Sequence, residues 1–460
     1  MSGTRAFRAA ATGARLLTGA VVAGACVVAV VLGVTAPWPS VQHEPASAEV
    51  TPLPGDTVLV CNGDFRAIGR DPANPFQMVT AGSPALSAAG SSGSAETTPL
   101  VADDLAEGGS AQRLVGAVEG RVAPLLAATE SISLAAEDLS GLAAAPCRPA
   151  SQDSWIVGGS VQTGTEDLIV LTNPGVVPST VTLVAHGSVR ASRTVIVPAE
   201  SQSAVPLTSL AAGSDLPMVH VTATGSPVRA VLQSSLTRTL DPAGVDLQDA
   251  VAAPQQHAVL PGVRLFETQG DNGDSTVVRL MSPDADAQAV VTVNALGSAA
   301  TAGTFDVPLT AGAPTELSLS ALAPGEYTVR VDSDTPVLSG VRQQEGGGPQ
   351  DDFAWVLPAP EIDDEVLAAI PLGPAPRLVL VNTEDVDATV QVEPVAGGEP
   401  VEVEVPAGSS SSIEVRPRTV YSLTGSGPIH ASVTMTDTGA LAVWPLWPAA
   451  GTQQSITVYP

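Results

Sequence analysis

The hydrophobic pattern of this chain is organised around an apolar run that stops at a turn and then recurs twice. The first run, Leu168–Gly175, ends in an Asn-Pro-Gly turn signal. Similar runs stop at turn signals within residues 276–283 and 377–383. A spacing of roughly a hundred residues is typical of tandem domains, because solenoid repeats recur every 20–50 residues or so.

Further short segments follow each run in the same order, and many alternate apolar and polar residues as half-buried strands do. Residues 401–406 give the clearest case, with valines and glutamates in strict alternation. Six or seven such strands per roughly hundred residues, separated by turn signals, predict antiparallel β-sandwiches. A β-propeller is the competing all-β architecture, but its blades recur every 40–50 residues or so.

We therefore predict a mainly β protein, in which an N-terminal transmembrane helix precedes tandem antiparallel, Ig-like β-sandwich domains. The expected order is a cytoplasmic tail, the transmembrane helix, a linker, an N-terminal extracytoplasmic β-rich region and three sandwich repeats. Their boundaries, in that order, are 1–15, 16–36, 37–55, 56–150, 151–256, 257–352 and 353–460.

The first 36 residues predict the membrane topology. Arg5, Arg8 and Arg15 precede an uncharged run over residues 16–36. About 20 apolar residues suffice for a helix to cross the hydrocarbon core, and flanking arginines stay on the cytoplasmic side. We expect a single-pass protein of the cell membrane with its bulk outside. A cleaved signal peptide is the alternative, and the protein is then secreted.

The region 56–150 begins with a predicted strand at 57–61, and its later part combines signals for helix and for strand. Residues 114–145 are rich in Ala and Leu, which favours helix, yet several Gly and Pro residues and a local alternation favour strands. The pattern favours strands and allows one short helix. Cys61 and Cys147 are the two cysteines outside the apolar run, and in an oxidising compartment they predict one disulfide.

Composition narrows the classes of partner. Hydrophobic residues make up 44% of the chain but aromatic residues only 3%, so the core must consist mainly of Val, Leu and Ala. The formal net charge is −28, and every basic residue apart from histidine is arginine. Nucleic-acid binding requires clustered cations that displace counterions from phosphates. This surface therefore argues against a nucleic-acid partner and is typical of a soluble extracytoplasmic coat.

A search for chemistry-bearing motifs finds no nucleophile elbow, zinc-binding helix or phosphate-binding loop. We therefore expect no enzymatic activity, no cofactor and no metal site. Acidic loops such as Asp271–Asp274 lack the spacing of a calcium loop, and turn formation explains them equally well. Trp444 and Trp447 are two of five tryptophans. They are candidate glycan contacts as a stacking platform, or they pack the end of a domain.

Three stretches carry a resemblance to a known family: Cys147 shortly before Trp155-Ile-Val-Gly-Gly, Leu168–Gly175, and Pro261-Gly262-Val263. In these the chain resembles actinobacterial envelope proteins of unknown function, which have one N-terminal membrane segment and a long β-rich outer region. Members of that family are often encoded beside a membrane glycosyltransferase. The resemblance implies a place near envelope polysaccharide and an envelope protein or glycosyltransferase as partner.

The leading hypothesis is a non-catalytic, membrane-anchored scaffold or accessory protein of the actinobacterial cell envelope. The alternative is a glycan-binding module that recognises envelope polysaccharide through exposed aromatic residues. A third hypothesis is an enzyme with a dispersed carboxylate pair, as glycosidases have. The 47 acidic residues offer no basis for choosing such a pair.

Overall fold

The computed structural model describes residues 3–35, 48–50, 53–70, 73–74, 77–91, 93–105, 108–120, 122, 124–267, 276–346, 348, 350–448 and 456–458. The chain forms two compact units, one of residues 1–52 with 454–460 and one of residues 53–453. Most of the predicted linker at 37–55 and the acidic loop Asp271–Asp274 lie outside the described residues.

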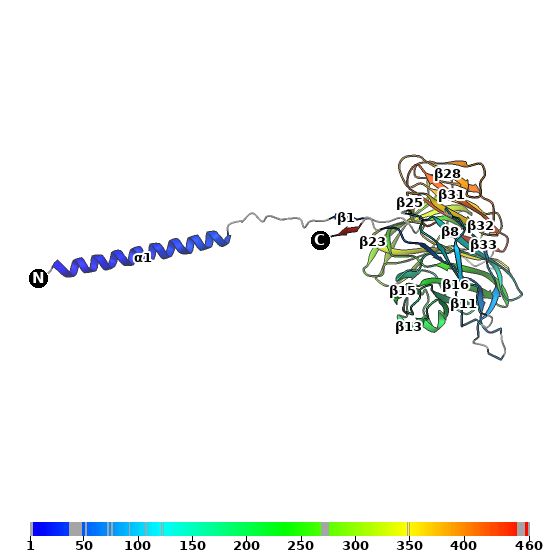
Figure 1. Cartoon of the computed structure of the whole chain (residues 1–460), viewed down its shortest axis with the longest axis horizontal. Coiled ribbons are helices and arrows are strands. Elements are labelled where there is room, and N and C mark those ends of the chain that lie inside the picture. Colours follow the sequence, from blue (N-terminus) through cyan, green and yellow to red (C-terminus); the bar gives the residue numbers. More distant parts are fainter. Residues whose placement is uncertain are drawn as a thin grey trace. The chain divides into compact units, whose positions relative to one another are not determined.

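The first unit contains helix α1 (Gly3–Thr35), drawn in blue in Figure 1. Its segment Leu16–Val34 is long and apolar enough to cross a membrane, a test that a signal sequence also passes. The helix includes residues 3–15, so the predicted boundary at residue 16 separates charged from apolar sequence, not coil from helix. In the same unit β1 (Ala48–Val50) pairs with β34 (Ile456–Val458), so the third repeat does not extend to residue 460 as predicted.

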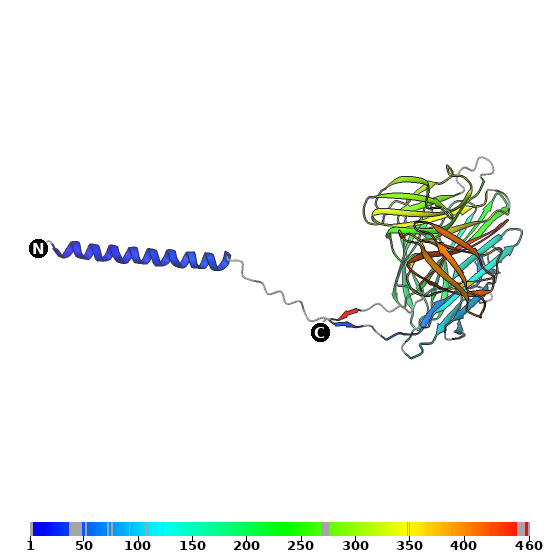
Figure 2. The ribbon, with the colours of Figure 1, turned by 90° about the horizontal axis from the view of Figure 1, so that it is seen from above.

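The second unit is built of antiparallel sheets, and its first sandwich spans residues 153–249 (Figures 1 and 2). One sheet has the order β14-β11-β16-β17 and the other β10-β15-β12-β13. A short helix, α2 (Thr208–Ala211), follows β14. The strands are β10 (Asp153–Ile156), β11 (Thr165–Asn173), β12 (Ser179–His186), β13 (Ala191–Val197), β14 (Ser201–Pro206), β15 (Met218–Gly225), β16 (Arg229–Arg238) and β17 (Asp241–Asp249).

The second sandwich, residues 255–356, repeats this order, with one long strand, β23, serving both sheets. The first half of β23 pairs with β18 and β20, and its second half pairs with β19 and β24. The strands are β18 (Gln255–Leu265), β19 (Val277–Met281), β20 (Ala287–Ala295), β21 (Thr301–Leu309), β22 (Thr315–Ser318), β23 (Gly325–Gln344) and β24 (Phe353–Val356). Because β24 completes this sandwich, the predicted boundary between 352 and 353 is several residues too early.

The third sandwich, residues 366–445, has sheets of order β30-β27-β32-β33 and β26-β31-β28-β29, and β25 (Glu361–Ile362) adds to the edge of β32. Its strands are β26 (Val366–Ile370), β27 (Arg377–Val381), β28 (Ala388–Pro394), β29 (Val401–Val405), β30 (Ser410–Glu414), β31 (Thr419–Gly425), β32 (Ile429–Asp437) and β33 (Ala440–Pro445). The three recurring apolar runs are thus the equivalent strands β11, β19 and β27.

Residues 57–146 form a reduced fourth copy of the same plan, which we call the N-terminal module. Its sheets have the orders β2-β7-β6 and β5-β8-β9, and a small hairpin joins β3 to β4. The regular elements described within 114–145 are strands joined by loops, and the alternating segment near Ile132 pairs on both sides. The strands are β2 (Thr57–Val60), β3 (Phe65–Ala67), β4 (Val79–Gly82), β5 (Ala85–Gly90), β6 (Glu96–Pro99), β7 (Gln112–Gly116), β8 (Leu126–Ala135) and β9 (Ser140–Pro146).

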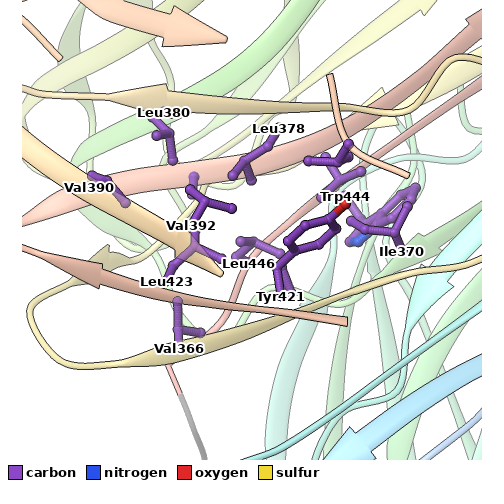
Figure 3. Close-up of a cluster of buried hydrophobic side chains, with 14 of the residues drawn as sticks. Val366, Ile370, Leu378, Leu380, Val390, Val392, Tyr421, Leu423, Trp444 and Leu446 are labelled. Atoms are coloured by element: carbon purple, nitrogen blue, oxygen red, sulfur yellow. The ribbon is translucent and has the colours of Figure 1, made fainter. Parts of the chain in front are cut away.

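Each sandwich has its own core of Val, Leu and Ala side chains, as the low aromatic content requires. Figure 3 shows part of the core of the third sandwich, where Trp444 lies among aliphatic side chains. The alternation in β29 holds at Val403 and Val405, which are buried, whereas Val401 is exposed. Alternation therefore places the polar face of each strand outside and the apolar face between two sheets.

The last strands of all four modules meet at one buried carboxylate, that of Asp352. Its Oδ2 accepts hydrogen bonds from the backbone N–H groups of Leu142 in β9 and Leu441 in β33, both at 2.8 Å. Its Oδ1 accepts from Val245 in β17 and Phe353 in β24, both at 3.0 Å. Burial raises the pKa of Asp352 well above its ordinary value, and the four N–H groups oppose that rise.

Candidate functional site

The carboxylate of Asp352, which we call the hub, lies where the four modules meet. Around it are four equivalent junctions between neighbouring modules. The N–H donors to Asp352 pair with residues of the preceding strand, namely Ser133, Ser235, Gln344 and Thr436. Two residues before each of these lies the position that faces the neighbouring module. That position is occupied by Ser131, Gln233, Arg342 and Thr434.

Three of these four side chains make a short local contact across their junction. Gln233 exchanges two hydrogen bonds with the backbone of Arg66, at 2.7 and 2.8 Å. Ser131 donates from Oγ to the carbonyl of Leu372 at 2.5 Å. Thr434 packs so closely on Gly262 that a Cβ at this glycine would lie 2.6 Å from the Thr434 Cγ2. Arg342 instead borders a cavity.

This cavity, which we call the junction pocket, lies between the first and second sandwiches and has a volume of about 530 Å³. Those at the other junctions measure about 300, 50 and 10 Å³. Ligand sites commonly occupy about 300–1,000 Å³. The charged and aromatic side chains that line the junction pocket are Asp167, Asp215, Arg238, Arg279, Glu316, Arg342, Phe353 and Trp355.

Arg279 is held firmly in the wall of the junction pocket. Its Nε and Nη2 donate to Glu316 Oε1 at 3.0 and 2.8 Å, and its Nη1 donates to the carbonyl of Gly159 at 2.8 Å. Its guanidinium also lies 4.9 Å from the ring centre of Trp355. Arg279 is 4% exposed, and a buried cation requires a partner. Glu316 compensates its charge.

Arg238 and Arg342 are arranged differently, because both donate to the same neutral oxygen. The Nη2 of Arg342 lies 2.8 Å from Gln344 Oε1, and the Nη2 of Arg238 lies 3.4 Å from it. Neither arginine makes an ion pair in the part of the chain that the structure describes. Burial, followed by the neighbouring charges of Arg279 and Arg238, lowers the pKa of Arg342 to about 10.

Burial raises the pKa values of two acids near these arginines. Asp167 accepts a hydrogen bond from the N–H of Ser160 at 2.6 Å, and burial raises its pKa to about 6. Asp246 accepts from the N–H of Trp355 at 2.9 Å, and burial raises its pKa to about 7. Near neutral pH part of the Asp246 population is therefore uncharged, so the arginines are less neutralised than a count of carboxyl groups indicates.

Residues 101–417 match the sequence model of a family described as a family of unknown function (DUF5719). The chain belongs to this family. No curated protein matches the chain. Among solved structures, the chain is similar to the crystal structure of chicken CNTN1 FN1-FN3 domains, at 12% identity and a TM-score of 0.12. That match covers 67% of this chain and 98% of the other.

The family match includes every lining residue of the junction pocket but neither tryptophan that the sequence singled out. Trp444 is 2% exposed and belongs to the core of the third sandwich (Figure 3). Trp447 is half-buried, and the guanidinium of Arg148 lies 3.4 Å from its ring centre. The proposed platform of Trp444 and Trp447 is therefore wrong for Trp444, which has no face free for a sugar.

The predicted disulfide between Cys61 and Cys147 is present and lies in the core of the N-terminal module. Glu130 is the third member of this cluster, and its carboxylate accepts hydrogen bonds from the N–H groups of Asn62 and Gly63. Because both sulfurs are bonded to each other, the cluster offers no thiolate to a metal ion.

Sequence reasoning missed the junction pocket, although one signal pointed to it. Arg279 interrupts the apolar run of the second repeat at a position where the other two repeats have Val170 and Val379. An arginine in a strand that is otherwise buried needs a specific partner or a cavity. The aromatic walls, Phe353 and Trp355, fall beyond the predicted end of the second repeat, which hid their proximity to Arg279.

Proposed function

We propose that this protein is a non-catalytic binding protein of the cell envelope, held at a membrane by α1, and that its ligand occupies the junction pocket. The apolar helix Leu16–Val34 supports the anchor, and the disulfide between Cys61 and Cys147 supports an extracytoplasmic location. The observation that carries the proposal is the cavity itself. Of four junctions built on one hub, one holds about 530 Å³ lined by charged and aromatic side chains.

Binding to a glycan is the second candidate, and the junction pocket gives it a new location. Trp355 and Phe353 are each 4% exposed, but unlike Trp444 they line this large cavity, together with hydroxyl groups of Thr165 and Ser234. Aromatic faces with nearby polar groups suit a sugar ring, whose own faces are partly apolar. An envelope protein or glycosyltransferase as partner, and an actinobacterial envelope as the setting, remain part of the proposal.

The test uses the full chain purified in detergent micelles and a panel of sugars, sugar acids and phosphates, followed by isothermal titration calorimetry. Thr163 is exposed and lines the junction pocket, so Thr163→Trp should fill its mouth without changing any charge. Thr180→Trp, on an exposed position of β12, is the matched control. We expect Thr163→Trp alone to abolish binding. Undiminished binding by Thr163→Trp, or no binding by any panel member, would overturn the proposal.

The membrane anchor is tested separately by a tag fused before Met1. Retention of the tag on a membrane-bound protein whose bulk is digested by external protease would support the anchor. Loss of the tag from the mature protein would show cleavage and would make the protein a secreted one. Crosslinking in native membranes followed by mass spectrometry would identify the partner, and recovery of no envelope protein would count against an accessory role.

A further inference from the structure

The positive charges of this protein are scarce, and their distribution is uneven. The chain has 19 arginines against 47 acidic residues. Three of the arginines line the junction pocket, together with the acids Asp167, Asp215 and Glu316. Of these acids, Glu316 is already bonded to Arg279. Three arginines gathered at one cavity of a strongly acidic protein are a local arrangement that the average charge does not explain.

Arg238 and Arg342 form the part of this arrangement that has no ion pair within the described residues, although the charges of Glu316 and Asp167 act on Arg342 from a longer distance. They reach the same oxygen of Gln344 from β16 of the first sandwich and β23 of the second. A neutral amide can accept both hydrogen bonds, but it cannot offset the repulsion between two guanidinium groups. An oxyanion between them would do so, because each guanidinium presents a planar fork of N–H donors that fits carboxylate or phosphate oxygens.

The surroundings leave space for such an anion and for the molecule that carries it. The guanidinium of Arg342 lies 5.2 Å from the ring centre of Phe353, so one face of the fork is supported. Trp355 lies beyond it on the same strand and also lines the cavity. The wall therefore continues from a cationic end to an aromatic part, which fits a small organic acid better than a bare ion.

We infer that the junction pocket takes a small ligand bearing a carboxylate or phosphate group, whose oxygens are held jointly by Arg238 and Arg342. This inference rests on the proposed function, because it names the class of ligand for the same pocket. The two arginines come from different sandwiches, so the anion bridges them at their junction. Both are positioning groups for the ligand, and no covalent step is involved.

Calorimetry on the full chain in detergent micelles tests this with three probes: glucuronate, inorganic phosphate and neutral glucose. We expect glucuronate or phosphate to bind at least tenfold more tightly than glucose, since a charge-assisted bidentate pair commonly contributes about tenfold or more. Arg342→Gln should weaken binding of that anion about tenfold, and Arg342→Lys, which keeps the charge but loses the fork, should weaken it less. Comparison of glucuronate with phosphate identifies the anionic group.

Arg330→Gln is the matched control, since Arg330 lies on the same strand β23 but outside the junction pocket and should leave binding unchanged. Arg238→Gln, at a partly exposed position, gives a second variant if Arg342→Gln fails to fold. If no anion binds, or if glucose binds equally and both glutamine variants retain affinity, the oxyanion inference is overturned. If the wild type then binds glucose and Thr163→Trp does not, the junction pocket binds a neutral ligand.

Discussion

The junction between the first and second sandwiches and the junction between the second and third share one frame but differ in what fills them. At the first, Arg342 borders a cavity of about 530 Å³. At the second, the equivalent Thr434 packs on Gly262, and the remaining cavity is about 10 Å³. Ser432 Oγ also donates to the carbonyl of Pro261 at 3.1 Å there. The second junction is therefore a packed interface.

The shared frame is the hub at Asp352, and one carboxylate serves all four modules because the equivalent positions are small. Gly141, Gly244 and Ala440 occupy the places that correspond to Asp352 in the other three copies. A Cβ at Gly141 or Gly244 would lie 2.6 or 2.7 Å from the Asp352 Oδ1. The difference between the two junctions thus arises from side chains that face outward from the hub and not from the backbone arrangement.

Asp352→Asn should have the largest effect, because it disturbs the frame on which both junctions depend. An asparagine has one oxygen, so its NH₂ group would face two of the four N–H donors. Each buried donor left unsatisfied costs about 1–3 kcal/mol, so we expect a loss of about 4 kcal/mol or more once the opposed NH₂ group is included. Urea unfolding followed by tryptophan fluorescence measures this loss.

Asp351→Asn is the control for that variant, because the neighbouring carboxylate accepts a bond from Gly348 and none from the four central strands. We expect the control to change the unfolding free energy by about 1 kcal/mol or less. Equal losses in the two variants would show that the hub does not hold the modules together, and the comparison of junctions would lose its common frame.

The strands and the helix could be predicted because they depend on local sequence pattern. The disulfide could be predicted because the expected location is an oxidising compartment. Alternation and turn residues locate β11, β19 and β27, and length with composition locates the apolar helix. The N-terminal module escaped notice as a fourth copy, since its strands are short and rich in Ala, Gly and Ser. Its two sandwich sheets also have three strands each within the described residues, against four in each sheet of the first sandwich.

The hub and the junction pocket could not be predicted, because they depend on contacts between residues far apart in the sequence. Asp352 follows Asp351 in a stretch that looks like a loop, and its four donors span Leu142 to Leu441. The pocket arginines lie on three different strands. Trp444 shows the opposite error, since a tryptophan directly before a proline near the end of the last repeat suggests exposure, yet tertiary packing buries it.

Thr434→Arg tests whether one side chain decides between a packed and an open junction. The substitution forces a long cation against Gly262 in a cavity of about 10 Å³. Overpacking and an unpaired, partly buried charge should lower the unfolding free energy by about 2–3 kcal/mol. Thr424→Arg, at an exposed position of β31, should change it by about 0.5 kcal/mol or less. A Thr434→Arg protein as stable as its control would mean that this junction is not packed.

The smallest expected effect is a pH dependence of the unfolding free energy that comes from Asp246. The equivalent residue in the second sandwich is Ala354, which does not titrate, so this effect distinguishes the two junctions. The folded-state pKa of about 7 lies above the ordinary value of 3.8, so between about pH 4 and 7 the native state holds a proton that the unfolded state has lost. The contribution of this carboxyl group to stability is therefore present at low pH and is lost as pH rises through 7. Asp246→Asn resembles the protonated form and can still accept the bond from Trp355.

The lead of Asp246→Asn over wild type in unfolding free energy should therefore grow by about 2 kcal/mol between pH 5 and pH 8. Urea titrations at the two pH values measure this difference. Asp215→Asn, which alters an exposed carboxyl at the mouth of the same pocket, should produce the same small change at both. A constant gap between Asp246→Asn and wild type across the range would show that Asp246 titrates as an ordinary carboxyl. The open junction would then differ from the packed one in shape alone and not in its electrostatics.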